Sequence, residues 1–552
     1  MLGLDKSRCD FVRTKDNNIR PDDEQEIVKD ALQFRNGSFC LPLRKLFMSY
    51  LRIVWETLKM TPFLTVVTVM DTSGQIFLNL RGRTLELAGV GMFLLLHHMF
   101  VSILVYSGNE KLGIDLSNAF GGKSYNHCKE IFGKGIMTMA LAYSMFTLPI
   151  MFNIGHVMKL SGIQGDLSDE VQLISRQTIG MYTLQMVNAL LQTFCMAQGH
   201  EQYFGLIGLI NMCIALAGNY FLIYYFDFGP AGYAIVRTSA EVITLCLAIY
   251  VYAFHTHKET QGLASWTDTT KGFFAYFIES IKFTLGSYAY GLGIEIAGYF
   301  IALTQDPDQI GAYLCMLNFA GYLFTIAVAF SVICRTRINI LIGMGAQKIA
   351  RNYYEFFIFC IIVFSIQGTV LLITTREYTA TLFTSSSPKM QAWMEWLIIC
   401  YAGMLSFEMT YHTSALGIKT VGKINILLIV AAILIIGVNI LGCYGLRQLD
   451  CTVTHFFIYS MCLCGCITTF AVCATMNYDW TKVQSSAEKE EQSRLIYEEN
   501  ADELTVKEEI DKISVNPINS KELEYQYSRP RLNKKQLPKR FDIYENGTGQ
   551  RD

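Results

Sequence analysis

Long apolar segments alternate with short polar connections along most of this chain. About twelve windows are long enough to cross a hydrocarbon core of about 30 Å. Their centres lie in residues 60–80, 87–106, 135–155, 177–196, 204–226, 231–254, 279–303, 310–333, 354–374, 393–414, 423–443 and 453–475. The pattern predicts an all-α integral membrane protein with twelve transmembrane helices, and the even number places both termini on one side of the membrane.

The most polar interruption of this pattern, residues 255–271, separates two groups of six windows. In the first group Ala197-Gln198-Gly199 precedes an asparagine in an apolar helix, Asn219, and in the second group residues 415–417 precede Asn439 in the same way. Such an echo indicates an internal duplication. We expect two pseudo-symmetric lobes of six helices, an arrangement in which many secondary transporters place their site at the interface between lobes.

Basic residues predict the orientation of the chain. With a cytosolic N-terminus, the inner loops carry about twelve Lys and Arg and the outer loops about seven, the asymmetry typical of membrane proteins. Residues 1–58 lack the apolar core of a signal peptide, so we expect them to stay in the cytosol. The predicted organisation is a cytosolic N-terminal tail (1–58), an N-lobe with spans 1–6 (59–255), an inter-lobe loop (256–272), a C-lobe with spans 7–12 (273–478) and a cytosolic, disordered C-terminal tail (479–552).

Composition excludes several classes of function. The chain has 552 residues, of which 52% are hydrophobic and 17% charged, with a formal net charge of −2. That balance argues against a soluble enzyme, and the near-zero charge argues against a partner such as nucleic acid. A P-loop for ATP is absent from the sequence, and we expect no enzymatic activity and no cofactor.

The cysteines and the tail add little chemistry. Most of the 16 cysteines lie in apolar segments, where a thiol behaves as a small hydrophobic side chain, so neither disulfides nor a metal site is expected. We expect a monomer in the plasma membrane, an endomembrane or the vacuolar membrane. A basic cluster in the C-terminal tail is a candidate contact with anionic lipid: Arg529, Arg531, Lys534, Lys535, Lys539 and Arg540.

Acidic residues inside the apolar windows are candidates for function. An ionisable group in mid-bilayer costs about 2.5–3.5 kcal/mol on insertion scales, so each needs a reason. Asp71, Glu241, Glu295 and Glu408 lie in such positions. Glu408 is followed one helical turn later by His412, a pair suited to holding a proton. The alternative for each acid is a buried carboxyl group satisfied by a neighbouring hydroxyl or backbone group.

Short motifs in a fixed order give a family resemblance. They are Leu85–Val90, Asn118–Gly121, Ala197–Gly199, Asn219-Tyr220, Gly229–Ala234, Phe330–Val332 with Arg337 and Gly343-x-Gly345, and Asp479–Lys482. Taken together over about residues 60–482, the chain resembles the multidrug and toxic compound extrusion (MATE) transporters of the eukaryotic branch.

The resemblance implies functional positions in both lobes. Glu295 matches the second acid of the family's seventh span, whereas the first acid falls on Tyr290. Glu408 matches the acid of the tenth span, and the eighth-span acid of animal members falls on Asn318, as in plant members. In the N-lobe, Asp71 resembles the acid of bacterial members.

We therefore expect a secondary antiporter that exports organic cations or amphiphilic compounds in exchange for protons. The expected proton- and substrate-binding residues are Glu295, Glu408, Asn318, Tyr290 and His412, and Asp71 with Asn219 is a candidate N-lobe ion site. The alternatives are a Na⁺-coupled exporter, a flippase for a lipid-linked substrate from the same fold group, and a membrane scaffold or receptor that has lost transport.

Overall fold

The structure is a computed structural model that describes residues 33–39, 41–97, 100–101, 103–160, 165–302, 307–384 and 388–483. All elements named below belong to one unit of the chain, Met1–Ala487. Within the described residues every regular element is a helix, which confirms the predicted all-α class. Most of the predicted C-terminal tail, with its basic cluster, lies outside the described residues.

The first half of the chain forms six helical rods. They are α3 (Leu43–Leu80); α4 (Thr84–His97) with α5 (Ile103–Gly121); α6 (Tyr125–Ala142) with η3 (Tyr143–Thr147), α7 (Leu148–Phe152) and α8 (Ile154–Leu160); α9 (Gly165–Gln177) with α10 (Ile179–Met196); α11 (Glu201–Asn219) with η4 (Tyr220–Tyr225); and α12 (Gly229–Phe254). A short helix, η1 (Gln33–Asn36), precedes them.

The second half forms six further rods after a connection that contains η5 (Lys258–Thr260) and α13 (Trp266–Thr270). They are α14 (Phe273–Ala302), α15 (Pro307–Gly343), α16 (Gln347–Thr384), α17 (Pro388–Thr420), α18 (Ile424–Ala431) with η6 (Ala432–Asn439) and α19 (Ile440–Gln448), and α20 (Val453–Met476), followed by η7 (Trp480–Lys482). The predicted two groups of six are thus confirmed in the described residues.

Most of these rods are apolar enough to cross a membrane. Within the described residues, eight contain a sufficiently long stretch of high hydropathy with few charges. The rods that fall outside this set are α4–α5, α9–α10, α14 and α17.

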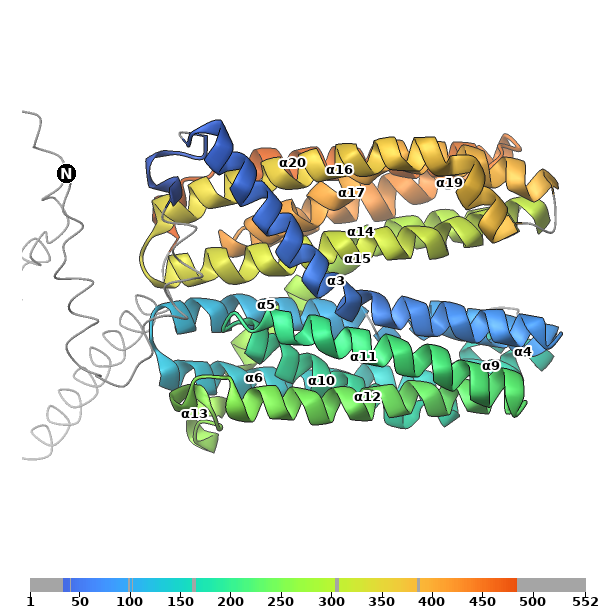
Figure 1. Ribbon diagram of the computed structural model, residues 1–552, viewed down its shortest axis with the longest axis horizontal. Coiled ribbons are helices and arrows are strands. Elements are labelled where there is room, and N and C mark those ends of the chain that lie inside the picture. The colour runs from blue at the N-terminus through green and yellow to red at the C-terminus, as the bar shows by residue number, and fades with distance from the viewer. Residues whose placement is uncertain are drawn as a thin grey trace, which may run out of the picture. The chain divides into compact units, whose positions relative to one another are not determined.

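Helix α3 connects the two groups of rods. In Figure 1 it begins beside the upper group, α14–α20, and continues along the lower group, α4–α12, with a change of direction in its middle. Pro62 lies inside α3, and an internal proline bends a helix because it removes a backbone hydrogen bond. The predicted boundary of the N-terminal tail at residue 58 falls within α3, which begins at Leu43.

The internal echo in the sequence has a structural counterpart. The fifth rod of each half contains a π-helical segment, η4 in the first and η6 in the second. Asn219 is the last residue of α11 before η4, and Asn439 is the last residue of η6. A third π-helical segment, η3, lies in the third rod of the first half, so such segments are not confined to the two fifth rods.

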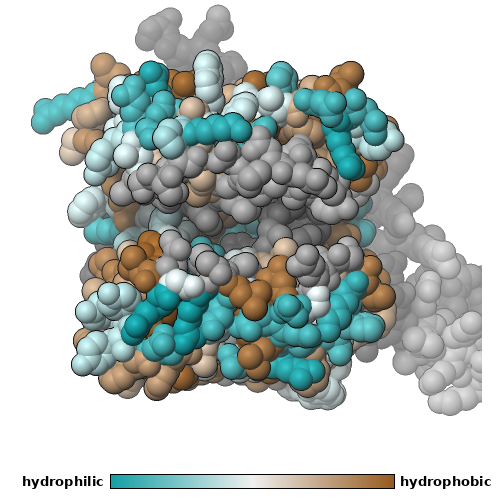
Figure 2. All heavy atoms as spheres, turned by 90° about the vertical axis from the view of Figure 1, so that its right-hand side faces the viewer, coloured by the Kyte–Doolittle hydropathy of each residue, from teal (hydrophilic) through white to brown (hydrophobic). Residues whose placement is uncertain are grey.

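The loops at the two ends of the rods differ in charge. We call the end that carries connections 121–125, 255–272, 343–347 and 420–424 the basic-loop end, because most of the basic residues predicted to face the cytosol lie there. Figure 2 shows the opposite end, where hydrophilic side chains gather on the upper and lower parts of the face. The flanks of the rods expose large apolar side chains, including Leu209, Val370 and Leu441, as expected for a lipid-facing surface.

Candidate functional site

A small cavity in the C-lobe is built around Glu408. This residue lies on α17 with 3% of its surface exposed. The cavity has a volume of about 30 Å³, and its wall is mostly apolar. It is lined by Ala297, Tyr313, Met316, Ala320, Tyr401, Met404, Glu408, Phe457 and Ser460. Among the described lining residues, Glu408 is the one that carries a carboxyl group.

Hydroxyl groups are the polar neighbours of this carboxyl group. Tyr401 lies two helical turns before Glu408, and its hydroxyl donates a hydrogen bond of 2.5 Å to Oε2. Ser460 lines the same cavity, and its buried Oγ has no hydrogen-bond partner among the described residues. No Lys, Arg or His of the described part of the chain lies within 4.0 Å of the Glu408 oxygens. A buried carboxylate without a cation is costly, so this group favours uptake of a proton or a cation.

His412 lies one turn beyond Glu408 but in a different environment. Its ring packs edge-to-face on Phe324 of α15, with ring centroids 4.8 Å apart. Its backbone carbonyl accepts a hydrogen bond of 3.3 Å from the Ser331 hydroxyl. The structure thus places His412 in the interface between α15 and α17, and it is not one of the residues that line the cavity of Glu408.

Three other predicted residues lie on helices that form the cavity wall. Glu295 and Tyr290 belong to α14, and Asn318 belongs to α15. Their side chains lie outside the described residues. Both helices reach the cavity, α14 through Ala297 and α15 through Met316.

In the N-lobe, Asp71 is part of a buried ion pair. Its Oδ1 accepts a hydrogen bond of 2.7 Å from the Tyr233 hydroxyl and lies 3.4 Å from Nε of Arg237. Tyr233 and Arg237 are one turn apart on α12, and Arg237 is 1% exposed. The predicted partner Asn219 instead donates to the carbonyl of Met70 at 3.0 Å and to the hydroxyl of Ser73 at 2.8 Å, so it ties α11 to α3.

The sequence-based prediction considered only acidic residues inside the apolar windows, so it did not include Arg237. The available signal was the spacing of Tyr233, Arg237 and Glu241, which recur every four residues on one face of α12. A buried basic residue on that face indicates that a nearby buried acid forms an ion pair with it.

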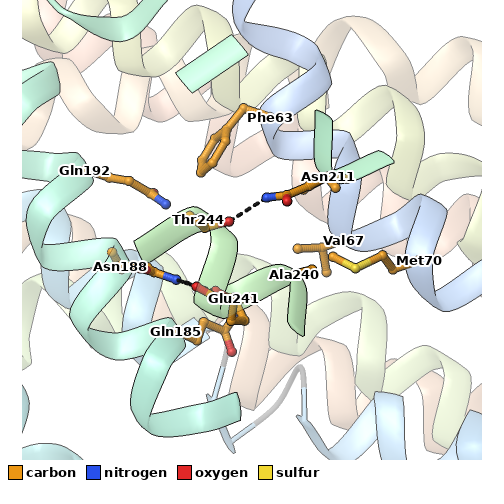
Figure 3. A pocket seen from close by; sticks show the side chains of 12 residues that line it. Phe63, Val67, Met70, Gln185, Asn188, Gln192, Asn211, Ala240, Glu241 and Thr244 are labelled. Carbon is orange, nitrogen blue, oxygen red and sulfur yellow. Dashed lines mark hydrogen bonds between the residues drawn. The ribbon is translucent and has the colours of Figure 1, made fainter. Parts of the chain in front are cut away.

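A second cavity lies in the N-lobe, beside Glu241 (Figure 3). It has a volume of about 30 Å³. Its polar wall comes from three helices and consists of Gln185, Asn188 and Gln192 of α10, Asn211 of α11, and Glu241 and Thr244 of α12. Asn188 donates to the Glu241 carboxylate at 2.6 Å, and Asn211 donates to the Thr244 hydroxyl at 2.5 Å. The described residues contain no cluster of three or more His, Cys, Asp or Glu suited to a metal ion.

Ion pairs join the two lobes toward the basic-loop end. Among the described residues, Lys111 pairs with Glu279 at 2.9 Å and Lys419 pairs with Glu110. A further pair, Arg337 with Glu56, joins α15 to the first part of α3. Lys111 also contacts Asp115 of its own helix at 2.9 Å. Of these residues, Glu110, Lys111 and Asp115 lie on α5 beyond the predicted end of the second window at residue 106, since the helix continues to Gly121.

The helix backbones also meet closely at this end. Gly121 of α5 lies against the backbone of Ile340 on α15, and Gly343 of α15 lies against the backbone of Asn118 on α5. A side chain larger than hydrogen has no room at either position. Glycine therefore permits the close crossing of two helices from different lobes.

Solved structures resemble this chain, whereas family profiles and curated sequences do not. No protein-family profile and no curated protein sequence matches this chain. Solved structures do match, among them the eukaryotic MATE transporter AtDTX14, with 16% identity, a TM-score of 0.70, and coverage of 80% of this chain and 99% of that chain. The Vibrio cholerae MATE transporter VcmN in its bent form matches with 15% identity, a TM-score of 0.64, and coverage of 78% and 97%.

A third match comes from a transporter of the MOP superfamily from Pyrococcus furiosus, whose binding pocket is described as having reverse polarity. It shares 12% identity with a TM-score of 0.65, covering 81% of this chain and 97% of that chain. At such identities the likeness concerns the fold, which is that of a multi-pass integral membrane protein. The resemblance seen in the sequence motifs is thus confirmed at this level, and the chain has the fold of the MATE transporters.

Proposed function

We propose that the protein is a secondary antiporter that exports an organic cation or an amphiphilic compound in exchange for protons. The observation that carries the proposal is the environment of Glu408, which is buried in an apolar cavity and held by the Tyr401 hydroxyl, with no basic side chain of the described residues beside it. Such a carboxyl group gains stability from either a proton or an organic cation, but it cannot hold both.

Competition for one carboxyl group couples the two movements. A proton that arrives from one side neutralises Glu408 and releases the cation, and loss of the proton to the other side restores the charge that binds the next cation. Exchange of one proton for one monovalent cation moves no net charge. The pH gradient alone then drives export, with about 1.4 kcal/mol per pH unit.

The other predicted residues of this site complete the proposal. Glu295 supplies a second carboxyl group from α14, Asn318 a polar side chain from α15, and Tyr290 an aromatic surface for a cation. His412 is proposed to support the site through the packing of its ring in the adjoining interface of α15 and α17. A flippase for an anionic lipid-linked substrate is less well supported, because the C-lobe cavity presents an acid and no described basic group.

Transport into proteoliposomes tests this function directly. Full-length protein is reconstituted, a pH gradient is imposed, and uptake of a fluorescent organic cation is followed. We expect Glu408→Gln to lose at least tenfold in proton-driven rate, because an amide binds neither a proton nor a cation by charge. The matched control is Glu377→Gln on α16, whose side chain is 75% exposed and which should transport like the parent.

Two results would contradict the proposal. Parental rates in Glu408→Gln would show that this carboxyl group is not the coupling site. Failure of any imposed pH gradient to move organic cations in the parent would remove proton-coupled export itself. Size-exclusion elution identical to that of the parent is required of each variant before its rate is read.

A further inference from the structure

The ammonium group of Lys111 lies in a box of aromatic rings and carboxylates between the two lobes. Its Nζ is 4.9 Å from the ring centroid of Tyr276 and 5.5 Å from that of Phe283. It also lies 2.9 Å from a carboxylate oxygen of Asp115 and 2.9 Å from one of Glu279. An aromatic ring attracts an ammonium group that lies over its face within about 6 Å. The box therefore holds Lys111 by ring faces as well as by opposite charge.

Three of these partners come from the C-lobe and share one face of α14. Tyr276, Glu279 and Phe283 are separated by three and four residues, which makes them neighbours along a helix. Lys111 and Asp115 lie one turn apart on α5, in the N-lobe. The rings and one carboxylate thus belong to one lobe, and the ammonium group that they hold belongs to the other.

The charges of the box are not shared equally between the lobes. Asp115 lies on the same helix as Lys111, so α5 keeps a neutral pair when it moves away from α14. Glu279 pairs with Lys111, and the Glu279 side chain is 53% exposed. Without Lys111, this face of α14 presents one carboxylate between two rings. A monovalent ammonium compound replaces both the charge and the contact with the rings that this face has lost.

The hydroxyl group of Tyr276 is a polar group of the box that Lys111 does not use. Its oxygen is buried and has no hydrogen-bond partner among the described residues. A buried polar group without a partner is costly, so this hydroxyl favours a ligand that can pair with it. Choline carries both a quaternary ammonium group and a hydroxyl group, and it is therefore a suitable probe.

We propose that Tyr276, Glu279 and Phe283 form a binding site for substituted ammonium compounds, which Lys111 occupies in this arrangement of the lobes. When the lobes part at the basic-loop end, Lys111 leaves with α5 and the site on α14 opens to a cationic compound. A bound compound then competes with the return of Lys111 and delays closure of this end. The site rests on the proposed function for the parting of the lobes, and it is separate from the cavity of Glu408, which other residues line.

Equilibrium binding of radiolabelled choline to the purified full-length protein in detergent tests the site. Lys111→Met keeps an unbranched side chain but removes the ammonium group. We expect this variant to bind choline about tenfold more tightly than the parent, because the internal competitor is gone. Addition of Glu279→Gln should abolish the gain. The neutral carbon isostere of choline should not compete, since it lacks the charge.

The matched control is Lys134→Met on α6. Lys134 is also a lysine of the N-lobe with little exposure, 12%, and it pairs with the carboxylate of Glu130 at 2.5 Å. Its loss should leave choline binding as in the parent. The gain of Lys111→Met should persist when Glu408→Gln is added, because the carboxyl group of the C-lobe cavity is not part of this site.

Chemical labelling of the parent covers the case in which Lys111→Met does not fold. The Lys111 side chain is 7% exposed, so an amine-reactive reagent should modify it slowly. Saturating choline should raise the labelling rate of Lys111 severalfold, measured by mass spectrometry, because it displaces this side chain from the box. The neutral isostere should leave the rate unchanged.

Three results would overturn the proposal. Folded Lys111→Met could bind choline no more tightly than the parent, its gain could survive Glu279→Gln or recur in Lys134→Met, or choline could leave the labelling of Lys111 unchanged. Choline binding at this site without proton-driven export in the parent would refute the proposed function and leave the site standing. Proton-driven export in a parent whose box fails these tests would do the opposite.

Discussion

Two buried acids, Asp71 in the N-lobe and Glu408 in the C-lobe, lie in different environments. In the N-lobe, Asp71 is matched by Arg237 within the same lobe. In the C-lobe, Glu408 is held by a tyrosine hydroxyl, and the described residues offer no basic group beside it. A matched acid stabilises a fixed arrangement, whereas an unmatched one is ready to exchange protons or cations. The lobes share a helical plan, but these two acids differ in whether a described cation lies beside them.

The largest expected effect is on stability in the N-lobe. Arg237→Met leaves Asp71 buried beside Tyr233 without its cation, and loss of one partner of a buried pair costs about 3–5 kcal/mol. We expect a marked fall in the melting temperature of the purified protein. The double variant Asp71→Asn with Arg237→Met removes both charges and should recover most of the loss. A melting temperature of Arg237→Met equal to that of the parent would mean that the pair contributes no stability.

The same kind of change in the C-lobe should act in the opposite direction. Glu408→Gln removes a charge that has no described counterion, so the melting temperature should stay equal or rise while transport is lost. If Glu408→Gln destabilises the protein as strongly as Arg237→Met does, the two lobes do not differ in the way their structures indicate.

Much of the fold was predictable because it depends on local pattern. The apolar windows, the break at residues 255–271 and the echo of Asn219 in Asn439 together predicted twelve rods in two groups. Several helices extend beyond the predicted windows, among them α3 at its start, α5 beyond residue 106 and α16 at both ends. The extensions of α3 and α5 carry charges that lower their hydropathy.

The candidate site was harder to predict because its contacts join distant segments. Lys111 meets Glu279, and Asp71 meets Arg237, across different rods. A single sequence shows each charge but not its partner, so a paired acid and an unpaired acid look alike. The four-residue spacing of Tyr233, Arg237 and Glu241 was a local signal, and it would have indicated the N-lobe pair.

The contact between the lobes can be broken without touching either interior. Gly121→Val would place a side chain against the backbone of Ile340, and overpacking of this kind costs about 1–3 kcal/mol. We expect proton-driven export to fall at least tenfold, because the lobes can no longer meet at the basic-loop end. The matched control is Gly180→Val in α10, where an added side chain meets no atom within 4 Å. Equal transport by both variants would show that this crossing is not required.

A smaller effect is expected from the hydroxyl that holds the C-lobe acid. Tyr401→Phe removes the hydrogen bond to Glu408, which favours the charged carboxylate. A hydrogen bond to a charged group contributes about 1.5–3 kcal/mol, and one pH unit corresponds to about 1.4 kcal/mol. Loss of this bond should therefore alter the pH dependence of proton-driven export. An unchanged pH profile would mean that Tyr401 does not tune this group.

The smallest effect sharpens the assignment along α17 itself. His412 and Glu408 are one turn apart, yet the ring of His412 packs on Phe324, and this residue is absent from the wall of the cavity. Replacement by another aromatic ring should preserve that packing, so we expect His412→Phe to change the rate of proton-driven export less than threefold. A loss as large as that of Glu408→Gln would show that the imidazole itself carries the proton, and the C-lobe site would then have to extend from the cavity into the interface of α15 and α17.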